Sequence, residues 1–186
     1  MNNEIAFIRH AKTKVDKGIP IEDWVLTEDG EKCAIELAKN KHLQATQVFI
    51  SSEESKAYLT IEPLAEKLGR KIVKIKELGE IARPNSEKLT SEEYGEMKIK
   101  IFKDLDYTEH EWETANHALN RFKAAVEKID KQYSNKKIVI CAHGTVMTLY
   151  FAYLQGKLND LFSRWEALEF GKVGIVKNGK VVRDIV

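Results

Sequence analysis

The chain has 186 residues, of which 43% are hydrophobic and 32% are charged, and this composition is typical of one folded domain rather than of a disordered segment. The 30 basic and 29 acidic residues leave a net charge of +1, so nothing in the overall charge indicates a nucleic-acid or membrane partner. The two cysteines, Cys33 and Cys141, form no CxxC pattern, which argues against a disulfide framework or a cysteine zinc site.

No apolar run approaches the roughly 20 residues that a membrane-spanning helix needs. The residues before Ile5 also lack the basic-then-apolar layout of a secretory signal peptide. With the cysteines indicating a reducing compartment, we expect a cytoplasmic protein whose partner is a small molecule.

Short apolar runs alternate along the chain with segments of helical periodicity. The expected elements are a strand at 5–8, a helix from the N-cap Thr27 to about Lys41, a strand at 48–50, a helix at 54–69, a strand at 72–75, a helix at 114–133, a strand at 137–142, a helix at 145–154 and two strands at about 166–176 and 181–185. Pro63 predicts a bend or a restart within the second helix. The Asn178-Gly179 pair predicts the turn of a closing hairpin.

This alternation predicts an α/β protein, a three-layer α/β/α sandwich with a mostly parallel sheet and one antiparallel strand near the C-terminus. We expect a single domain over residues 1–186, with residues 83–113 as a small helical insertion. Residues 86–113 hold nine acidic residues and four lysines. Such an insertion is often a lid over a site, and the alternative is a solvated helical excursion with no role.

Polar residues follow each of the first four predicted strands. Because ligands of open α/β sheets bind beyond the carboxyl ends of the strands, these residues are the candidates for a site. They are Arg9-His10 after the first strand, Ser51-Ser52 and Lys56 after the second, Glu80 beyond the third, and His143-Gly144-Thr145 after the fourth.

This set suits phosphoryl transfer. A neutral imidazole, here that of His10, is a competent nucleophile towards phosphorus near pH 7. The anionic group in transfer needs cations and N–H donors, which Arg9, Lys56, a protonated His143 and the backbone at Gly144 and Thr145 would supply. Glu80 is the candidate acid for the departing oxygen, with Glu77 as its competitor in the same segment.

Five segments of the chain resemble, in the same order, the motifs of the histidine phosphatase (phosphoglycerate mutase-like) superfamily. They are residues 7–13 around Arg9-His10, residues 26–30 with Leu26-Thr27 and Gly30, residues 51–60 with Ser51-Ser52, Lys56 and Thr60, residues 78–80 with Leu78 and Glu80, and residues 142–144 with His143-Gly144. One motif alone would be weak, whereas five in order are specific.

The resemblance implies a phosphohistidine intermediate on His10 and a proton donor at Glu80. It implies that Arg9, Lys56 and His143 hold the phosphate, and that no metal or other cofactor takes part. Thr13 and Ser52 match positions near the phosphate. There are two departures from the motifs: Ala11 replaces the usual glycine, and Lys56 replaces the usual arginine.

Lys56 keeps the positive charge of the arginine but loses its planar two-pronged grip on an anion. The first hypothesis from the resemblance is a phosphatase for phosphomonoesters, which the small size of the chain favours over a mutase. The alternatives are phosphotransfer of the phosphoglycerate mutase type, and a phosphate-binding regulatory module with weak or no turnover, which Lys56 motivates. The acidic insertion argues weakly against highly anionic substrates.

Overall fold

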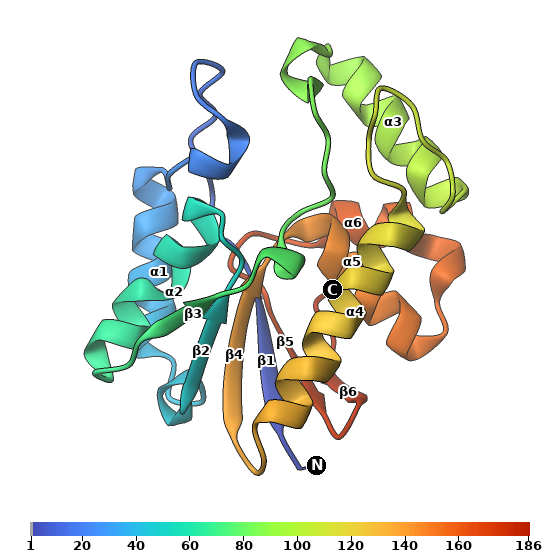
Figure 1. The fold of residues 1–186 in the computed structure, drawn as a ribbon. Helices are drawn as coiled ribbons and strands as arrows, with labels where there is room; N and C mark the ends of the chain where they lie inside the picture. The colour runs from blue at the N-terminus through green and yellow to red at the C-terminus, as the bar shows by residue number, and fades with distance from the viewer. Residues whose placement is uncertain (1) are drawn as a thin grey trace.

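The computed structural model describes residues 2–186, which form one six-stranded sheet with helices on both faces (Figure 1). The strands are β1 (Glu4–Arg9), β2 (Val48–Ser51), β3 (Ile72–Lys74), β4 (Lys137–Ala142), β5 (Val173–Lys177) and β6 (Lys180–Arg183). The α-helices are α1 (Glu28–Lys39), α2 (Ser55–Lys67), α3 (Ser91–Lys103), α4 (Ala115–Gln132), α5 (Gly144–Gln155) and α6 (Leu161–Ala167). No helix among residues 2–186 is both long enough and apolar enough to cross a membrane.

The sheet has the strand order β3-β2-β4-β1-β5-β6. The strands β1, β2, β3 and β4 pair in parallel, whereas β5 is antiparallel to both β1 and β6. The predicted fold class, with its mostly parallel sheet and one antiparallel strand near the C-terminus, is thereby confirmed. The hairpin turn is confirmed as well, since Asn178 and Gly179 both have the positive φ that a two-residue turn of this kind requires.

The strands β1, β2 and β4 are buried on both faces, which explains why they read as continuous apolar runs, whereas the edge strands β3 and β6 are largely exposed. Along β1, Phe7 faces the core beneath α4 and α5, whereas Ala6 and Ile8 face the core beneath α1 and α2. Figure 1 shows these two helical layers on opposite sides of the sheet. Because β1 and β4 lie at the centre of this sandwich, the residues at their ends are held by packing from both sides.

Two local expectations are wrong in part. Helix α2 runs as one helix through Pro63, so of the predicted bend or restart the restart is wrong. Residues 161–167, part of which we predicted as the start of a strand, form the short helix α6. Trp165 in this helix lies against Phe102 of α3 and against Phe162. Helix α6 therefore packs on the insertion, a tertiary contact that the local sequence pattern does not reveal.

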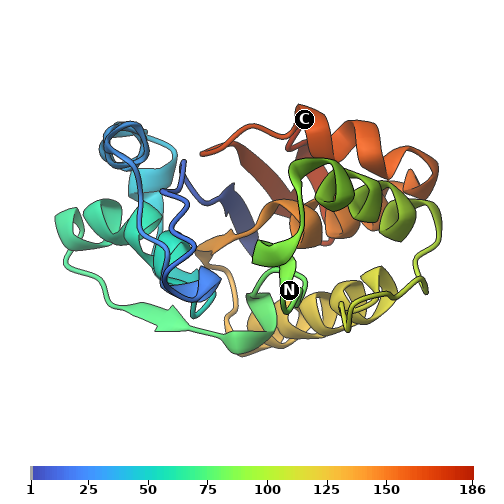
Figure 2. The same ribbon diagram turned by 90° about the horizontal axis from the view of Figure 1, so that it is seen from above.

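The insertion contains one substantial helix, α3, which begins with a capping box. Thr90 accepts a hydrogen bond from the backbone N–H of Glu93, and the Glu93 side chain accepts from the backbone N–H of Thr90. In Figures 1 and 2 this helix lies beyond the carboxyl ends of the strands, near α5 and α6. Met97, Ile101 and Phe102 are buried, so α3 is docked on the domain rather than extended into solvent.

Helix α1 begins at a position where the chain approaches itself closely. Thr27 caps the helix by accepting from the backbone N–H of Gly30. The same threonine donates its own backbone N–H to the carbonyl of Lys12. A Cβ on Gly30 would lie 2.2 Å from that carbonyl oxygen, so only glycine fits between the helix and the strand-end loop.

We therefore expect the substitution Gly30→Ala to lower the free energy of unfolding by about 1–3 kcal/mol, because a backbone atom has to move. The matched control is Gly95→Ala in α3, where nothing lies within 4 Å of the added Cβ. That change is expected to raise stability by roughly 0.5–1 kcal/mol, since alanine is the better helix former. Urea unfolding followed by circular dichroism measures both. Equal effects of the two substitutions would contradict the steric argument.

Candidate active site

Parallel pairing brings the ends of β1, β2 and β4 to one edge of the sheet. Arg9 is level with Ala142, and Ser51 is level with Cys141. The pairing continues one residue beyond β1, where the backbone N–H of His10 donates to the carbonyl of Ala142 (3.0 Å). The side chains that follow these strands in the sequence therefore meet at this edge.

The two predicted histidines lie next to each other, with their ring planes tilted by 54°. The ring centroids of His10 and His143 are 5.2 Å apart. Both residues are buried, with 8% of the surface of His10 and 0% of that of His143 exposed. His10 follows β1, and His143 follows β4 as the N-cap residue of α5. Two imidazoles more than a hundred positions apart in the chain are thus buried next to each other.

Hydrogen bonding fixes the tautomer of His10. Its Nδ1 lies 2.8 Å from the carbonyl oxygen of Ala11, an atom that only accepts, so Nδ1 carries the proton. Thr13 Oγ1 lies 3.1 Å from the same nitrogen and donates its own proton to that carbonyl. Burial, with the nearby charges of His143, Lys56 and Arg9, holds the pKa of His10 well below its usual value, so the ring is neutral at pH 7. A neutral ring with Nδ1 protonated presents a bare lone pair on Nε2.

The Ala11 side chain that replaces the usual glycine causes no backbone strain. Ala11 is fully buried beside Leu26 and Ala34, and it is not among the residues with positive φ. Its backbone N–H donates to Thr60 Oγ1 (2.9 Å), which anchors the loop after His10 to α2. The space beside the loop accepts one methyl group.

His143 has one engaged ring nitrogen and one that is not. Its Nε2 lies 2.7 Å from Ser52 Oγ and 3.0 Å from Glu54 Oε1. Its Nδ1 is buried and has no hydrogen-bond partner within residues 2–186. Burial lowers the pKa of His143, although the carboxylates of Glu54 and Glu80 oppose that effect.

Arg9 approaches the start of α5. Its Nη1 donates to the carbonyl oxygen of Leu168, and its guanidinium carbon lies 4.0 Å from the centre of the Phe170 ring. A Cβ on Gly144 would lie 3.3 Å from two atoms of that guanidinium, so the glycine after His143 leaves the room that Arg9 occupies. The Nε atom of Arg9 is buried without a hydrogen-bond partner in the part of the chain that the structure describes.

Lys56 is buried and held from two sides. Its ammonium lies 2.5 Å from Glu54 Oε2 and donates to the carbonyl of Ile21 at 2.8 Å. An ammonium has three N–H donors, so these contacts leave one for an anion. Lys56 is therefore fixed in place, whereas the ammonium of a solvated lysine would be mobile.

Glu80 is bound by the start of α5. The backbone N–H of Thr145 donates to its Oε2 (3.0 Å), and the N–H of Ile81 donates to its Oε1 (2.9 Å). Burial by itself raises the pKa of this carboxyl, but Lys98, Arg83 and His143 hold the pKa well below its usual range. In contrast, its competitor Glu77 is exposed. The structure thus brings Arg9, His10, Lys56, Glu80 and His143 together and leaves Glu77 outside.

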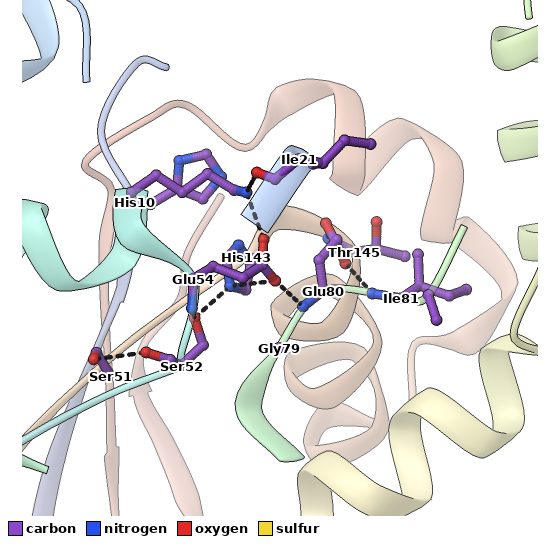
Figure 3. A network of polar contacts seen from close by, with 12 residues as sticks. His10, Ile21, Ser51, Ser52, Glu54, Gly79, Glu80, Ile81, His143 and Thr145 are labelled. Atoms are coloured by element: carbon purple, nitrogen blue, oxygen red, sulfur yellow. Dashed lines mark hydrogen bonds and ion pairs between the residues drawn. The ribbon is translucent and has the colours of Figure 1, made fainter. Parts of the chain in front are cut away.

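The sequence analysis missed Glu54, whose carboxylate touches three parts of the site (Figure 3). It contacts Lys56 and the Nε2 atom of His143, and it accepts the backbone N–H of Glu80 at 2.8 Å. Burial alone would raise its pKa, yet the charges of His143 and Lys56 lower the pKa of Glu54 to about 2. The sequence does carry a faint signal for this role, because an acidic residue precedes the motif lysine by two positions.

Lys98 of α3 was missed as well, having been counted only among the charges of the insertion. It is fully buried, and its ammonium donates to Thr145 Oγ1 at 2.7 Å. Three aromatic rings lie 5.4–6.0 Å from the ammonium, those of Tyr94, Trp112 and Trp165. Burial lowers the pKa of Lys98 to about 7, with Glu80 opposing the shift. The insertion thus brings a cation to the residues that hold Glu80.

A cleft of about 800 Å³ adjoins these residues. One wall is the segment 17–24, and the opposite wall is the segment 79–85, which includes Glu80 and Arg83. Glu54 also lines the cleft, whereas His10 and His143 do not. Within the described residues, the cleft therefore reaches the predicted acid but stops short of the paired imidazoles.

The fold and the site together define an α/β protein with paired histidines at the carboxyl ends of parallel strands. The chain belongs to the histidine phosphatase superfamily (branch 1), which its residues 5–180 match. Family membership supports phosphatase or mutase activity. A search of curated proteins found no match.

Three solved structures illustrate the shared fold. Bacillus stearothermophilus YhfR has a TM-score of 0.79 at 23% identity, over 98% of this chain and 96% of that chain. A mycobacterial glucosyl-3-phosphoglycerate phosphatase in complex with VO3 has a TM-score of 0.78 at 18% identity, over 98% and 97%. A mutant phosphoserine phosphatase from Entamoeba histolytica in complex with phosphoserine has a TM-score of 0.75 at 18% identity, over 97% and 94%.

The buried charge of Lys98 yields a prediction about stability. Its pKa is 10.5 in an unfolded chain and about 7 in the fold, so between these values the unfolded state holds more protons and stability rises with pH. Replacing Lys98 by methionine should remove this rise, because the group that binds its proton differently in the two states is gone.

The measurement is urea unfolding between pH 6 and 10, on the wild type, on Lys98→Met and on a control. The control is Lys103→Met, which removes an exposed charge from the last turn of the same helix. If Lys98→Met kept the rise of the wild type between pH 7 and pH 10, that rise would belong to another group and would contradict the assignment to Lys98.

Proposed function

We propose that this protein is a phosphatase that hydrolyses a phosphomonoester through a phosphohistidine intermediate on His10. The observation that carries the proposal is the bare Nε2 of a neutral His10 beside the ring of His143, 5.2 Å between centroids. In the first step Nε2 attacks phosphorus and the bond to the ester oxygen breaks. In the second, water attacks the phosphohistidine and releases inorganic phosphate.

Arg9, Lys56 and His143 hold the phosphate in this proposal. Each carries a donor that its protein contacts leave open, namely the buried Nε of Arg9, the third N–H of Lys56 and, once protonated, Nδ1 of His143. Such donors stabilise the charge on the equatorial oxygens of the group in transfer. Thr13 and Ser52 each contact an imidazole nitrogen, so we assign them to orienting the two rings in place of direct phosphate binding.

Glu80 is the proposed proton donor, although its carboxyl is ionised in the ligand-free site. A bound phosphate dianion opposes that ionisation, because a like charge nearby raises the pKa of a carboxyl. Protonation of Glu80 therefore accompanies substrate binding, and the proton then passes to the departing ester oxygen. The cleft that Glu80 lines is the proposed site of the leaving group.

We propose that residues 83–113 act as a lid. The support is that Lys98 of this segment is fully buried against Thr145, whose backbone N–H binds Glu80. The lid therefore adds a positive charge close to the reacting groups while its outer surface is acidic. A hinged segment of this kind excludes water during transfer and opens for release of the product.

The nucleophile is tested by the substitution His10→Ala. With an aryl phosphate and a metal chelator, we expect the wild type to turn over and the variant to lose at least about 10³-fold in kcat, because no other group accepts the phosphoryl. Acid quenching of the wild type should trap phosphate on His10. Full activity of His10→Ala, or conversion of phosphoglycerate isomers without hydrolysis, would contradict the phosphatase proposal.

The acid is tested by comparing Glu80→Gln with the matched control Glu77→Gln, which changes an exposed carboxylate three residues away. For an alkyl phosphate, whose alkoxide needs a proton, we expect Glu80→Gln to reduce kcat roughly 10²–10⁴-fold. For a nitrophenyl phosphate the reduction should be much smaller, because that leaving group departs without protonation. Equal losses on both substrates would assign Glu80 to binding.

A further inference from the structure

We propose that Glu54 is a positioning residue that keeps a proton on Nε2 of His143, so that His143 takes up a second proton at Nδ1 when a tetrahedral dianion binds. The same carboxylate fixes the ammonium of Lys56. The inference deepens the proposed function, on which it rests for the location of the anion. It assigns to Glu54 the control of the charge state of the phosphate site.

The two carboxylate oxygens of Glu54 contact two different basic side chains. Oε1 lies 3.0 Å from His143 Nε2, and Oε2 lies 2.5 Å from Lys56 Nζ. The backbone N–H of Glu80 donates to Oε1 at 2.8 Å, which holds the carboxylate from a third direction. In Figure 3 the carboxylate lies between His143 and the backbone of Glu80.

The contact with Glu54 assigns the proton on His143. An ionised carboxylate has only acceptors, so its approach to Nε2 requires that Nε2 carries the hydrogen. Ser52 Oγ is compatible with this, because it accepts the backbone N–H of Glu54 at 3.3 Å and accepts from Nε2 as well. In a neutral ring the other nitrogen, Nδ1, is then a bare acceptor, which would repel an anionic oxygen.

That repulsion bears on the binding of an anion. Nδ1 of His143 is the buried ring atom that lacks a partner among the described residues, and the neighbouring ring is that of His10. A phosphate oxygen in this space is bound only if Nδ1 gains a proton. His143 then becomes an imidazolium between two anions, the ligand on one side and Glu54 on the other.

The surrounding charges permit this change. The groups that face His143 are Glu54 and Lys56 at the start of α2, Glu80 and Arg83 after β3, His10 and Arg9 at the end of β1, and Lys98 through Thr145. Without a ligand the cations and burial dominate, and the pKa of His143 is lowered. A dianion offsets the cations, which leaves the attraction of Glu54 and Glu80 to favour the imidazolium.

Glu54 also bears on the replacement of arginine by lysine at position 56. A guanidinium is a rigid planar fork, whereas an ammonium needs outside contacts to define its position. Glu54 and the carbonyl of Ile21 supply those contacts, at 2.5 Å and 2.8 Å. The Glu54 carboxylate thus has two effects: it orients the ammonium of Lys56, and it favours the imidazolium form of His143.

The test is ¹⁵N NMR of the imidazoles at pH 7.5, because the nitrogen shifts report which ring atoms carry protons. The signals of His143 are assigned by their loss in His143→Asn. Sulfate serves as the tetrahedral dianion, since it does not titrate in this range. In the ligand-free wild type we expect the proton on Nε2 alone, and with saturating sulfate we expect both nitrogens protonated.

The variant is Glu54→Gln, and the control is Glu66→Gln, an exposed glutamate of the same helix. An amide turns either its oxygen or its NH₂ towards Nε2, so the tautomer is no longer fixed. In Glu54→Gln, His143 should therefore bind sulfate as a neutral ring protonated at Nδ1, and its imidazolium signal should be lost. Glu66→Gln should behave as the wild type.

Three outcomes would overturn the inference: a wild-type ring protonated at Nδ1 before sulfate is added, an imidazolium that persists in Glu54→Gln, or no response of His143 to sulfate. The first and third need no variant, so the test survives if Glu54→Gln fails to fold. Hydrolysis is measured separately, and the expected NMR pattern without turnover would overturn the proposed phosphatase alone.

Discussion

The parallel pairing of β1 with β4 is the constraint on which the site depends. The two strands end side by side, β1 at Arg9 and β4 at Ala142, and the hydrogen bond from the His10 backbone to Ala142 extends the ladder beyond them. The residue after each strand end is one of the two paired histidines. Both strands are central and buried on both faces, so their ends have little freedom to move apart. The separation of the two imidazoles is thus set by the sheet, and the flanking loops only adjust the rings.

Charge balance is the second organising principle of this site. Four cationic side chains, Arg9, Lys56, Arg83 and Lys98, converge with the carboxylates of Glu54 and Glu80 around two neutral imidazoles. Burying charges is costly unless they are paired, and here the basic side chains outnumber the carboxylates. The proposed phosphate dianion would offset this excess, which gives a physical reason for the cluster of cations.

Most of the fold and the core of the site could be predicted from the sequence, because both rest on local patterns. Apolar runs that stop at Arg9-His10 and at His143 mark strand ends, and parallel strands bring such ends together. Glu54 and Lys98 were not predicted, because each looks in the sequence like an ordinary charge on an exposed helical turn. Only tertiary packing buries them, the former by the approach of His143 and the latter by the docking of α3. Helix α6 was not predicted for a similar reason, since its Trp165 packs on Phe102 of that docked helix.

The hydrogen bond from Lys56 to the carbonyl of Ile21 joins two regions with different tasks. Ile21 lines the cleft, whereas Lys56 does not line it and is one of the proposed phosphate ligands at the start of α2. If the cleft takes the leaving group as proposed, a change in this loop would shift a proposed phosphate ligand through one backbone oxygen. The choice of leaving group and the affinity for phosphate would then be coupled through this single hydrogen bond.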